Sequence, residues 1–261
     1  MGDHLGIGKA IEKLMDPITD LVKRVAGPAA DEVGLTLQDS IKVWRAARQY
    51  KLFEKMNGTI SNAGFVPNPI ALKVLLPALD YASVEDNEDL HTIWANLLAN
   101  AADPRQISPV SPAFPLILKE LSSRDARFLH VLFINTIGVI AVSHEKREVE
   151  DFDYSERNLI EIYAGNGLTR VPNFTELTIA DYQANREEIG QDLREFKLTF
   201  ELARRHGIIR ESIYPRRLEA WQREQVYNRG EMLSFDLNKR YSFSHIGSSF
   251  MRACQPPSAK A

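Results

Sequence analysis

The feature that most constrains the fold is the helical spacing of apolar residues, which recurs along most of the chain and is clearest between residues 86 and 103. This stretch reads DNEDLHTIWANLLANAAD, with Asp86 or Asn87 as N-cap, acidic residues in the first turn and a stop at Asp103-Pro104. Its apolar residues repeat every three or four positions: Leu90, Ile93, Trp94, Leu97, Leu98 and Ala101. The sequence therefore predicts an amphipathic helix with one buried face.

Two asparagines share a face of this helix, because Asn96 and Asn100 lie four residues apart. Their side-chain amides can bind a neighbouring helix, a loop backbone or a ligand. Most asparagines in such places are structural, and this is the interpretation we favour. With Trp94 they are our candidate interaction residues on this helix.

The first 26 residues predict an amphipathic N-terminal helix that kinks or breaks at Pro17. Its apolar stripe needs a surface to bury against, which the body of the protein, a second copy or a membrane can supply. The polar face mixes acids and bases, which weakens the membrane option. The apolar positions are Ile7, Ile11, Leu14, Ile18, Leu21, Val22 and Val25.

A second long helical stretch covers residues 29 to 62 and carries a comb of basic residues at steps of three and four. A stripe of this kind can meet the phosphates of a nucleic acid, but a solvated helix face explains it as well, and we favour the latter. The basic residues are Lys42, Arg45, Arg48, Lys51 and Lys55, of which Arg45 and Arg48 are candidate interaction residues.

The rest of the first half predicts further helices. Residues 70 to 83 predict a short buried helix that ends or kinks near Pro77, and residues 104 to 113 predict a proline-rich loop. One helix is expected from Ser111-Pro112 and another from Ser122 or Ser123. We expect the apolar run at 128 to 142, with His130, to be buried core; at 15 residues it is shorter than a bilayer span of roughly 20.

After a charge-dense connecting region at 143–184, residues 185–261 follow the outline of a winged-helix-like C-terminal domain. A helix at 186–206 ends at Gly207, GIIRESI predicts a strand, MLSFDL and KRYSFS predict two edge strands, and HIGSSFMRAC predicts a closing helix. Domains of this outline bind DNA or proteins, and the fold does not choose between them. Arg204, Arg205 and Arg210 are the candidate interaction residues here, although nearby glutamates dilute their charge.

Composition and motif searches exclude several chemistries. The formal net charge of −3 argues against strong nonspecific binding to nucleic acid or anionic lipid, and the single Cys254 excludes an internal disulfide and a cysteine-rich zinc site. The glycine-rich start GDHLGIGK lacks the residues of a phosphate-binding loop. Cys254 is expected to be a half-buried apolar residue. We therefore expect no catalytic residue, cofactor or metal, and a cytoplasmic location.

An acidic cluster at residues 148–156 is the one place where oxygen ligands could hold a divalent cation. A solvated linker is the interpretation we favour. The cluster contains Glu148, Glu150, Asp151, Asp153 and Glu156.

Three blocks of the sequence resemble the bacterial abortive-infection alpha family, long described only as a domain of unknown function. They are GPAADEVGLTLQDSIKVWR (27–45), PIALKVLLPALDYASVEDNEDLHTIWANLLANAAD (69–103) and SPAFPLILKELSSRDARFL (111–129), and the ending KRYSFSHIGSSFMRAC also fits. The resemblance is good over residues 27–142 and implies a role in anti-phage abortive infection. It carries over no catalytic residues, and its tryptophan and asparagines at 94–100 mark a packing nucleus as readily as a site.

Together these features predict a mainly α protein with four regions: an amphipathic helix at 1–26, a helical core at 27–142, the connecting region and the winged-helix-like part. We expect a non-enzymatic interaction protein of phage defence that binds a protein partner or its own copy. The alternatives are a membrane-associated effector that acts through the N-terminus, peripheral to the inner membrane, and a DNA-binding regulator that uses the C-terminal part.

Overall fold

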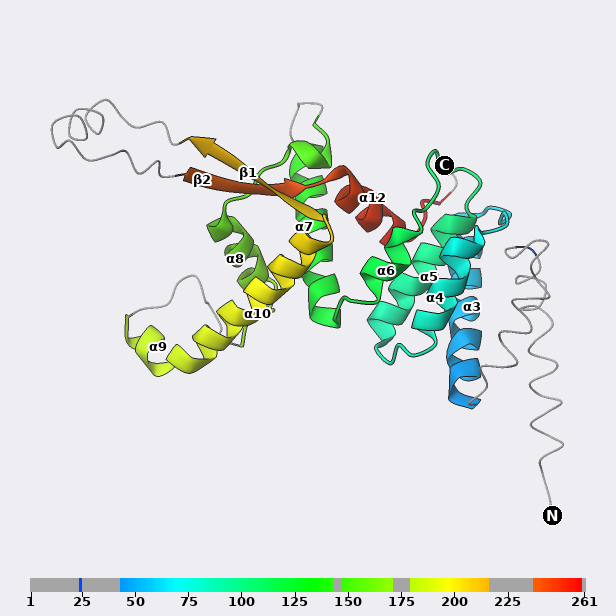
Figure 1. Ribbon diagram of the computed structural model, residues 1–261, viewed down its shortest axis with the longest axis horizontal. Coiled ribbons are helices and arrows are strands. Elements are labelled where there is room, and N and C mark those ends of the chain that lie inside the picture. The colour runs from blue at the N-terminus through cyan, green and yellow to red at the C-terminus, as the bar shows by residue number, and fades with distance from the viewer. Residues whose placement is uncertain (1–23, 25–42, 143–146, 171–178, 216–236, 260–261) are drawn as a thin grey trace, which may run out of the picture. The chain divides into compact units, whose positions relative to one another are not determined.

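The computed structural model describes residue 24 and residues 43–142, 147–170, 179–215 and 237–259 (Figure 1). These residues are mainly helical and include one two-stranded antiparallel sheet, which confirms the predicted class at this level. The chain divides into two compact units, the first made of Met1–Ala126 with Phe250–Ala261 and the second of Arg127–Ser249. The elements are α3 (Val43–Ala63), α4 (Leu72–Ala82), α5 (Glu88–Ala102), α6 (Ala113–Leu118), α7 (Ser123–Val142), η2 (Val149–Asp151), α8 (Glu156–Gly165), α9 (Ile179–Ala184), α10 (Arg186–Arg205), β1 (Ile209–Pro215), β2 (Leu237–Phe243) and α12 (His245–Cys254).

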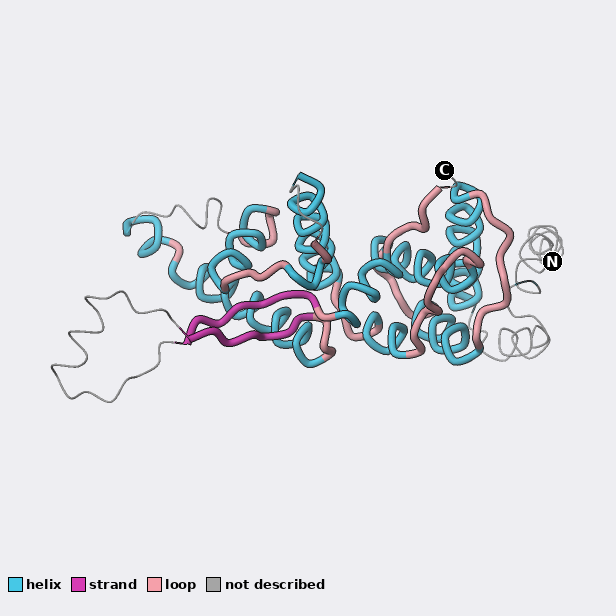
Figure 2. Tube along the Cα trace, turned by 90° about the horizontal axis from the view of Figure 1, so that it is seen from above, coloured by secondary structure: helices cyan, strands magenta, loops and turns pink. Residues whose placement is uncertain are grey.

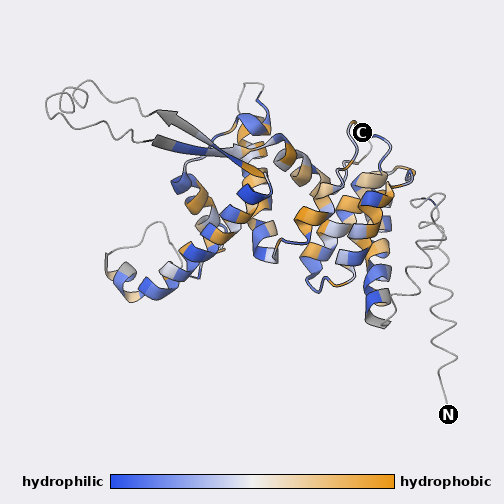
Figure 3. Cartoon of the chain, viewed as in Figure 1, coloured by the Kyte–Doolittle hydropathy of each residue, from blue (hydrophilic) through white to orange (hydrophobic). Residues whose placement is uncertain are grey.

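The first unit packs α3, α4, α5 and α6 around one apolar core, with the last turns of α12 added to it. Hydrophobic residues are dense along α4, α5 and α6 (Figure 3). Trp94 lies in this core with 1% of its surface exposed, and the rings of Phe114 and Phe250 meet edge to face at 5.5 Å. The surrounding elements thus cover α5 on several sides, and ten of its residues are buried.

The helix does not end near Pro77, one of the two predicted outcomes, because α4 continues through this residue to Ala82. Proline lacks an N–H, so a helix that contains it loses one backbone hydrogen bond. Four neighbours on α4 are buried and hold the helix against the core on both sides of the proline: Val74, Leu75, Ala78 and Leu79.

The second unit is built around a run of aromatic rings. Phe196 on α10 contacts Tyr163 of α8 at 5.4 Å, Phe128 of α7 at 5.9 Å and Phe200 at 5.8 Å between ring centroids. Phe200 in turn meets Tyr241 of β2 edge to face at 4.7 Å. Since α8 supplies Tyr163, the stretch at 143–184 contributes to a core and is more than the connecting region expected from its charge.

The two strands of the sheet are β1 and β2, which run side by side as an antiparallel pair (Figure 2) with Ile209 opposite Phe243. KRYSFS belongs to β2 and pairs with β1, the strand predicted for GIIRESI. All of MLSFDL except Leu237 lies outside the described residues. The helix at 186–206, its stop at Gly207 with φ of +67° and the closing helix are confirmed.

The prediction that residues 128–142 are buried core is only half right. Phe128, Leu132 and Phe133 of α7 are buried, but Ile134 and Ile137 farther along the helix are 46% and 41% exposed. His130, expected in the core, lies on the exposed side of the helix. Among the described residues, α7 is the one helix long and apolar enough to cross a membrane, with 20 residues, a window hydropathy of 1.5 and 33% of that window buried.

The two units do not coincide with the four regions expected from the sequence. Their boundary falls inside α7 and inside α12, so each of these helices contributes residues to both units. The last residues of the chain group with the first unit and not with the C-terminal part. The amphipathic segment at 1–26, apart from Arg24, and residues 29–42 of the 29–62 stretch lie outside the described residues.

The backbone of α12 at Gly247 lies close to the backbone of Ile208. A Cβ atom on this residue would lie 2.0 Å from the carbonyl oxygen of Ile208. Ser244 sets this approach: its N–H donates to the same carbonyl at 2.9 Å, and its Oγ accepts from the N–H of Gly247.

We predict that Gly247→Ala lowers the free energy of unfolding by about 2 kcal/mol or more, because the atoms that the new methyl group meets are backbone atoms. Urea unfolding of the purified protein measures the change. The control is Gly190→Ala on α10, where the nearest atom is the end of the Arg194 side chain at 3.6 Å, and no loss of stability is expected. Equal stability of both variants would contradict the close approach.

Candidate functional site

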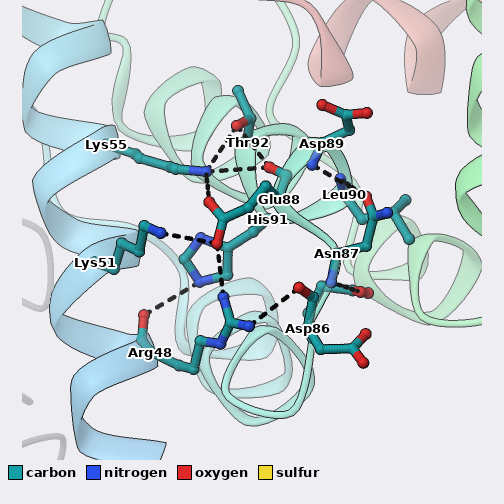
Figure 4. A network of polar contacts seen from close by, with 11 residues as sticks. Arg48, Lys51, Lys55, Asp86, Asn87, Glu88, Asp89, Leu90, His91 and Thr92 are labelled. Atoms are coloured by element: carbon teal, nitrogen blue, oxygen red, sulfur yellow. Dashed lines mark hydrogen bonds and ion pairs between the residues drawn. The ribbon is translucent and has the colours of Figure 1, made fainter.

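The basic comb of α3 converges on one carboxylate at the start of α5. Arg48 and Lys51 donate to Oε1 of Glu88 at 2.9 and 2.8 Å, and Lys55 donates to Oε2 at 3.0 Å (Figure 4). Asn87 caps α5 beside them, since its side-chain oxygen accepts from two backbone N–H groups of the first turn. Three cations thus share a single acidic side chain in the first turn of α5.

This arrangement shifts two titratable groups in ways that follow from their surroundings. The ammonium groups of Lys51 and Lys55 and the guanidinium of Arg48 hold the pKa of Glu88 at about 2, below its ordinary value of 4.5. His91 lies fully buried behind the cluster, with its Nε2 3.1 Å from the carbonyl oxygen of Arg48. Burial, followed by the charge of Lys55, lowers the pKa of His91, so the imidazole is neutral at pH 7.

Arg45, one turn earlier on α3, binds the end of α4 instead. Its Nη2 donates to Asp80 at 2.7 Å and its Nε donates to Ser83 at 3.0 Å. The candidate residues Arg45 and Arg48 therefore hold α3 against α4 and α5. The spacing of the basic residues correctly predicted that they share one stripe of α3. The sequence did not identify Glu88 as a partner, because its place in the first turn of a helix was its only distinguishing feature.

Asn96 and Asn100 bind the C-terminal end of α12. Nδ2 of Asn96 donates to the carbonyl of Cys254 at 3.1 Å, and Nδ2 of Asn100 lies 3.0 Å from the carbonyl of Ala253 and 2.7 Å from that of Gln255. The last carbonyls of a helix have no donor within the helix, so these amides supply what α12 lacks. Of the partners expected for the asparagines, the structure shows a neighbouring helix end.

A second contact extends this attachment along the chain. Arg105 is paired with the buried Asp103 and donates to the carbonyl of Ser258 at 3.0 Å, while its guanidinium lies over the ring of Phe65 at 4.8 Å. The Arg105 side chain lowers the pKa of Asp103. Sequence reasoning missed Arg105 because it lies in a predicted loop whose partners are distant in sequence. We call the contacts of Asn96, Asn100 and Arg105 with residues 253–258 the C-terminal clamp.

The C-terminal arginines also have partners within the second unit. Arg204 pairs with Glu211 at 2.8 Å, and Arg210 donates to Ser242 and to the carbonyl of Glu150. Arg205 is exposed in the last turn of α10. Nucleic-acid contact through these residues stays a prediction.

The acidic cluster at 148–156 performs local structural tasks. Glu148 and Asp151 cap η2 reciprocally, and the buried carboxylate of Glu150 accepts from the hydroxyl of Ser248. Among the residues that the structure describes, no group of three or more potential ligands could hold a metal ion. Cys254 is buried, which raises the pKa of its thiol.

We predict that Asn100→Ala lowers the free energy of unfolding by about 2–3 kcal/mol, because the buried carbonyls at the end of α12 lose their donors. Urea unfolding measures the loss, and limited proteolysis is expected to cut sooner around residues 253–259. The control is Asn57→Ala on the exposed face of α3. If the C-terminal clamp contributed nothing to stability, Asn100→Ala and Asn57→Ala would have the same free energy of unfolding.

We predict that Glu88→Gln lowers stability at pH 7 and that the difference from the native protein disappears in acid. The depressed pKa of Glu88 means that its contribution is complete above about pH 4.5 and is lost as the pH falls toward 2. Denaturation midpoints at pH 7, 5 and 3 test this, with Glu54→Gln, an exposed carboxylate on α3, as the control. A difference that does not change with pH would be inconsistent with the ion pairs.

Comparison with known proteins gives one match. The family model described as abortive infection alpha matches residues 45–254, a range that contains every described helix and strand except the start of α3. No curated protein and no solved structure matches the chain. Because the family model covers most of the sequence, the chain belongs to the abortive infection alpha family.

Proposed function

We propose that the protein is a non-enzymatic, cytoplasmic interaction protein of a bacterial anti-phage abortive-infection system. Membership of the family gives the role in abortive infection. The observation that supports an interaction protein is the exposed apolar surface of α7, where Ile134, Ile137, Val139 and Val142 are 41–79% exposed. Exposed apolar residues gathered on one helix favour a binding surface.

The polar candidate residues support the same proposal, because they are already engaged within the protein. Arg45 and Arg48 are paired with acidic groups on α4 and α5, and Asn96 and Asn100 bind main-chain carbonyls. Since these groups already have partners inside the protein, the surface of α7 is the stronger candidate for recognition.

The C-terminal elements take a second part in this proposal. We propose that α10, β1, β2 and the start of α12 form a winged-helix-like part that recognises protein. Arg204 and Arg210 contact acidic or carbonyl groups of the protein itself, which favours a protein partner over a nucleic acid.

Replacement of one exposed residue tests the proposal. We predict that Ile137→Asp abolishes phage protection in a plating assay and the capture of partners by the tagged protein during infection, because a charge enters the apolar surface. Leu198→Asp, which changes an exposed leucine on α10, is the matched control and keeps both. Protection that survives Ile137→Asp would contradict this surface, and nucleotide or nucleic-acid turnover lost in Asp153→Asn would refute the non-enzymatic role.

A membrane-associated effector is the second candidate, and the length and hydropathy of α7 favour it. A 20-residue helix is about 30 Å long, the thickness of the hydrocarbon core of a bilayer. The N-terminal segment proposed for membrane contact lies outside the described residues. Flotation with anionic liposomes, with and without residues 1–26, separates the two functions: recovery with the vesicles supports the effector, and recovery in the aqueous fraction supports the interaction protein.

A further inference from the structure

The second half of α7 carries a continuous stripe of exposed residues without a charge. Along α7, positions 128–142 contain no Asp, Glu, Lys or Arg. Seven residues between 134 and 142 are exposed, and five of them follow a spacing of three, one, three and one, which places these five on one side of the helix. Asn135 and Val139 are exposed beside them. We call the set of five the α7 stripe: Ile134, Ile137, Gly138, Ala141 and Val142.

The opposite side of α7 is fixed in the second unit, so the orientation of the stripe is set by packing. Phe133 meets Phe243 of β2 edge to face at 5.7 Å, and the hydroxyl of Thr136 lies 2.8 Å from that of Tyr154. A Cβ atom on Gly138 would have no neighbour within 4 Å. The stripe therefore presents two isoleucines beside an open notch.

Large and small residues alternate along the stripe in a pattern that fits itself. If two copies of α7 pack antiparallel about a twofold axis between residues 137 and 138, Ile134 of one copy lies opposite Ala141 of the other. Ile137 likewise lies opposite Gly138. Each bulky side chain then meets a small one, which is how the ridges of one helix fill the grooves of another.

We propose that the α7 stripe binds the same stripe of a second copy of this chain in an antiparallel helix pair. A twofold interface must be complementary to itself, and an uncharged stripe meets its copy without like-charge repulsion. A parallel pair would set isoleucine against isoleucine and glycine against glycine. This inference rests on the proposed function, because it names the partner of the surface on which that function depends.

Disulfide cross-linking tests both the contact and its direction. In the full-length protein, the double variant Ile134→Cys with Ala141→Cys is expected to form a covalent dimer on mild oxidation, whereas each single variant is not. Residues 134 and 141 of one copy are about 10 Å apart along the helix axis, too far for a bond within one chain. The native Cys254 is buried and adds little background. Dimers from the single variants would indicate a parallel pair and overturn the proposal.

A second variant tests the notch independently of cross-linking. Gly138→Leu is expected to raise the dimer dissociation constant at least about tenfold in sedimentation equilibrium, because its side chain fills the space that Ile137 of the other copy needs. Leu198→Lys on α10 is the control and leaves the dissociation constant unchanged. Circular dichroism checks that both variants are folded. A native chain that is monomeric up to about 100 µM would overturn the inference.

The remaining outcomes separate this inference from the proposed function. A monomer that captures another protein through Ile137 would remove the second copy and leave the interaction role intact. A dimer that turns over nucleotide would support the second copy and refute the non-enzymatic role. Flotation of the native chain with phosphatidylglycerol vesicles, lost in Ile134→Lys, would assign the stripe to a bilayer and overturn the inference.

Discussion

The hydrogen bonds from Asn96 and Asn100 to the end of α12 are the interaction on which the first unit depends. The last carbonyls of α12 are buried and lack donors within their own helix. The two asparagines lie on a mostly apolar helix, where an amide without a partner would cost several kcal/mol. The asparagine amides and the α12 carbonyls each supply the hydrogen-bond partner that the other lacks. These bonds hold the end of α12 in place, where Phe250 packs against Phe114.

Ion pairs also hold α3 against α5 in the first unit. Arg48, Lys51 and Lys55 surround Glu88 on a partly exposed surface, where single ion pairs contribute little to stability. Their value lies in the combined geometry, because three side chains from successive turns of α3 reach one residue of α5. The described residues of the basic stripe, which look available in the sequence, thus already have acidic partners within the fold.

The parts that the sequence predicted well depend on local physics, and the others depend on distant contacts. The period of α5, the cap at Asn87 and the stop at Gly207 are visible in a window of a few residues. The pairing of β1 with β2 places Ile209 opposite Phe243, which lies 34 residues later in the sequence. No pattern within either strand indicates this partner. The exposure of Ile134 and Ile137 was missed because an apolar run reads the same whether another element covers it or not.

The candidate residues show the same limit. That the asparagines share a face follows from their spacing of four. Their partners, Ala253, Cys254 and Gln255, lie more than 150 residues away, and no periodicity connects the two. Arg105 is harder still, since a loop residue between two prolines reads as a turn and its contact with Ser258 appears only in three dimensions.

The division of the first unit between two stretches of chain has a consequence for its biosynthesis. Residues up to Ala126 leave the ribosome early, but Phe250 and the carbonyls that the clamp holds follow only after the whole second unit has been made. At bacterial elongation rates this interval is on the order of ten seconds. During that time the surface of α5 that receives α12 is uncovered, so a nascent chain passes through a state in which Asn96 and Asn100 lack the carbonyls that they bind in the folded protein.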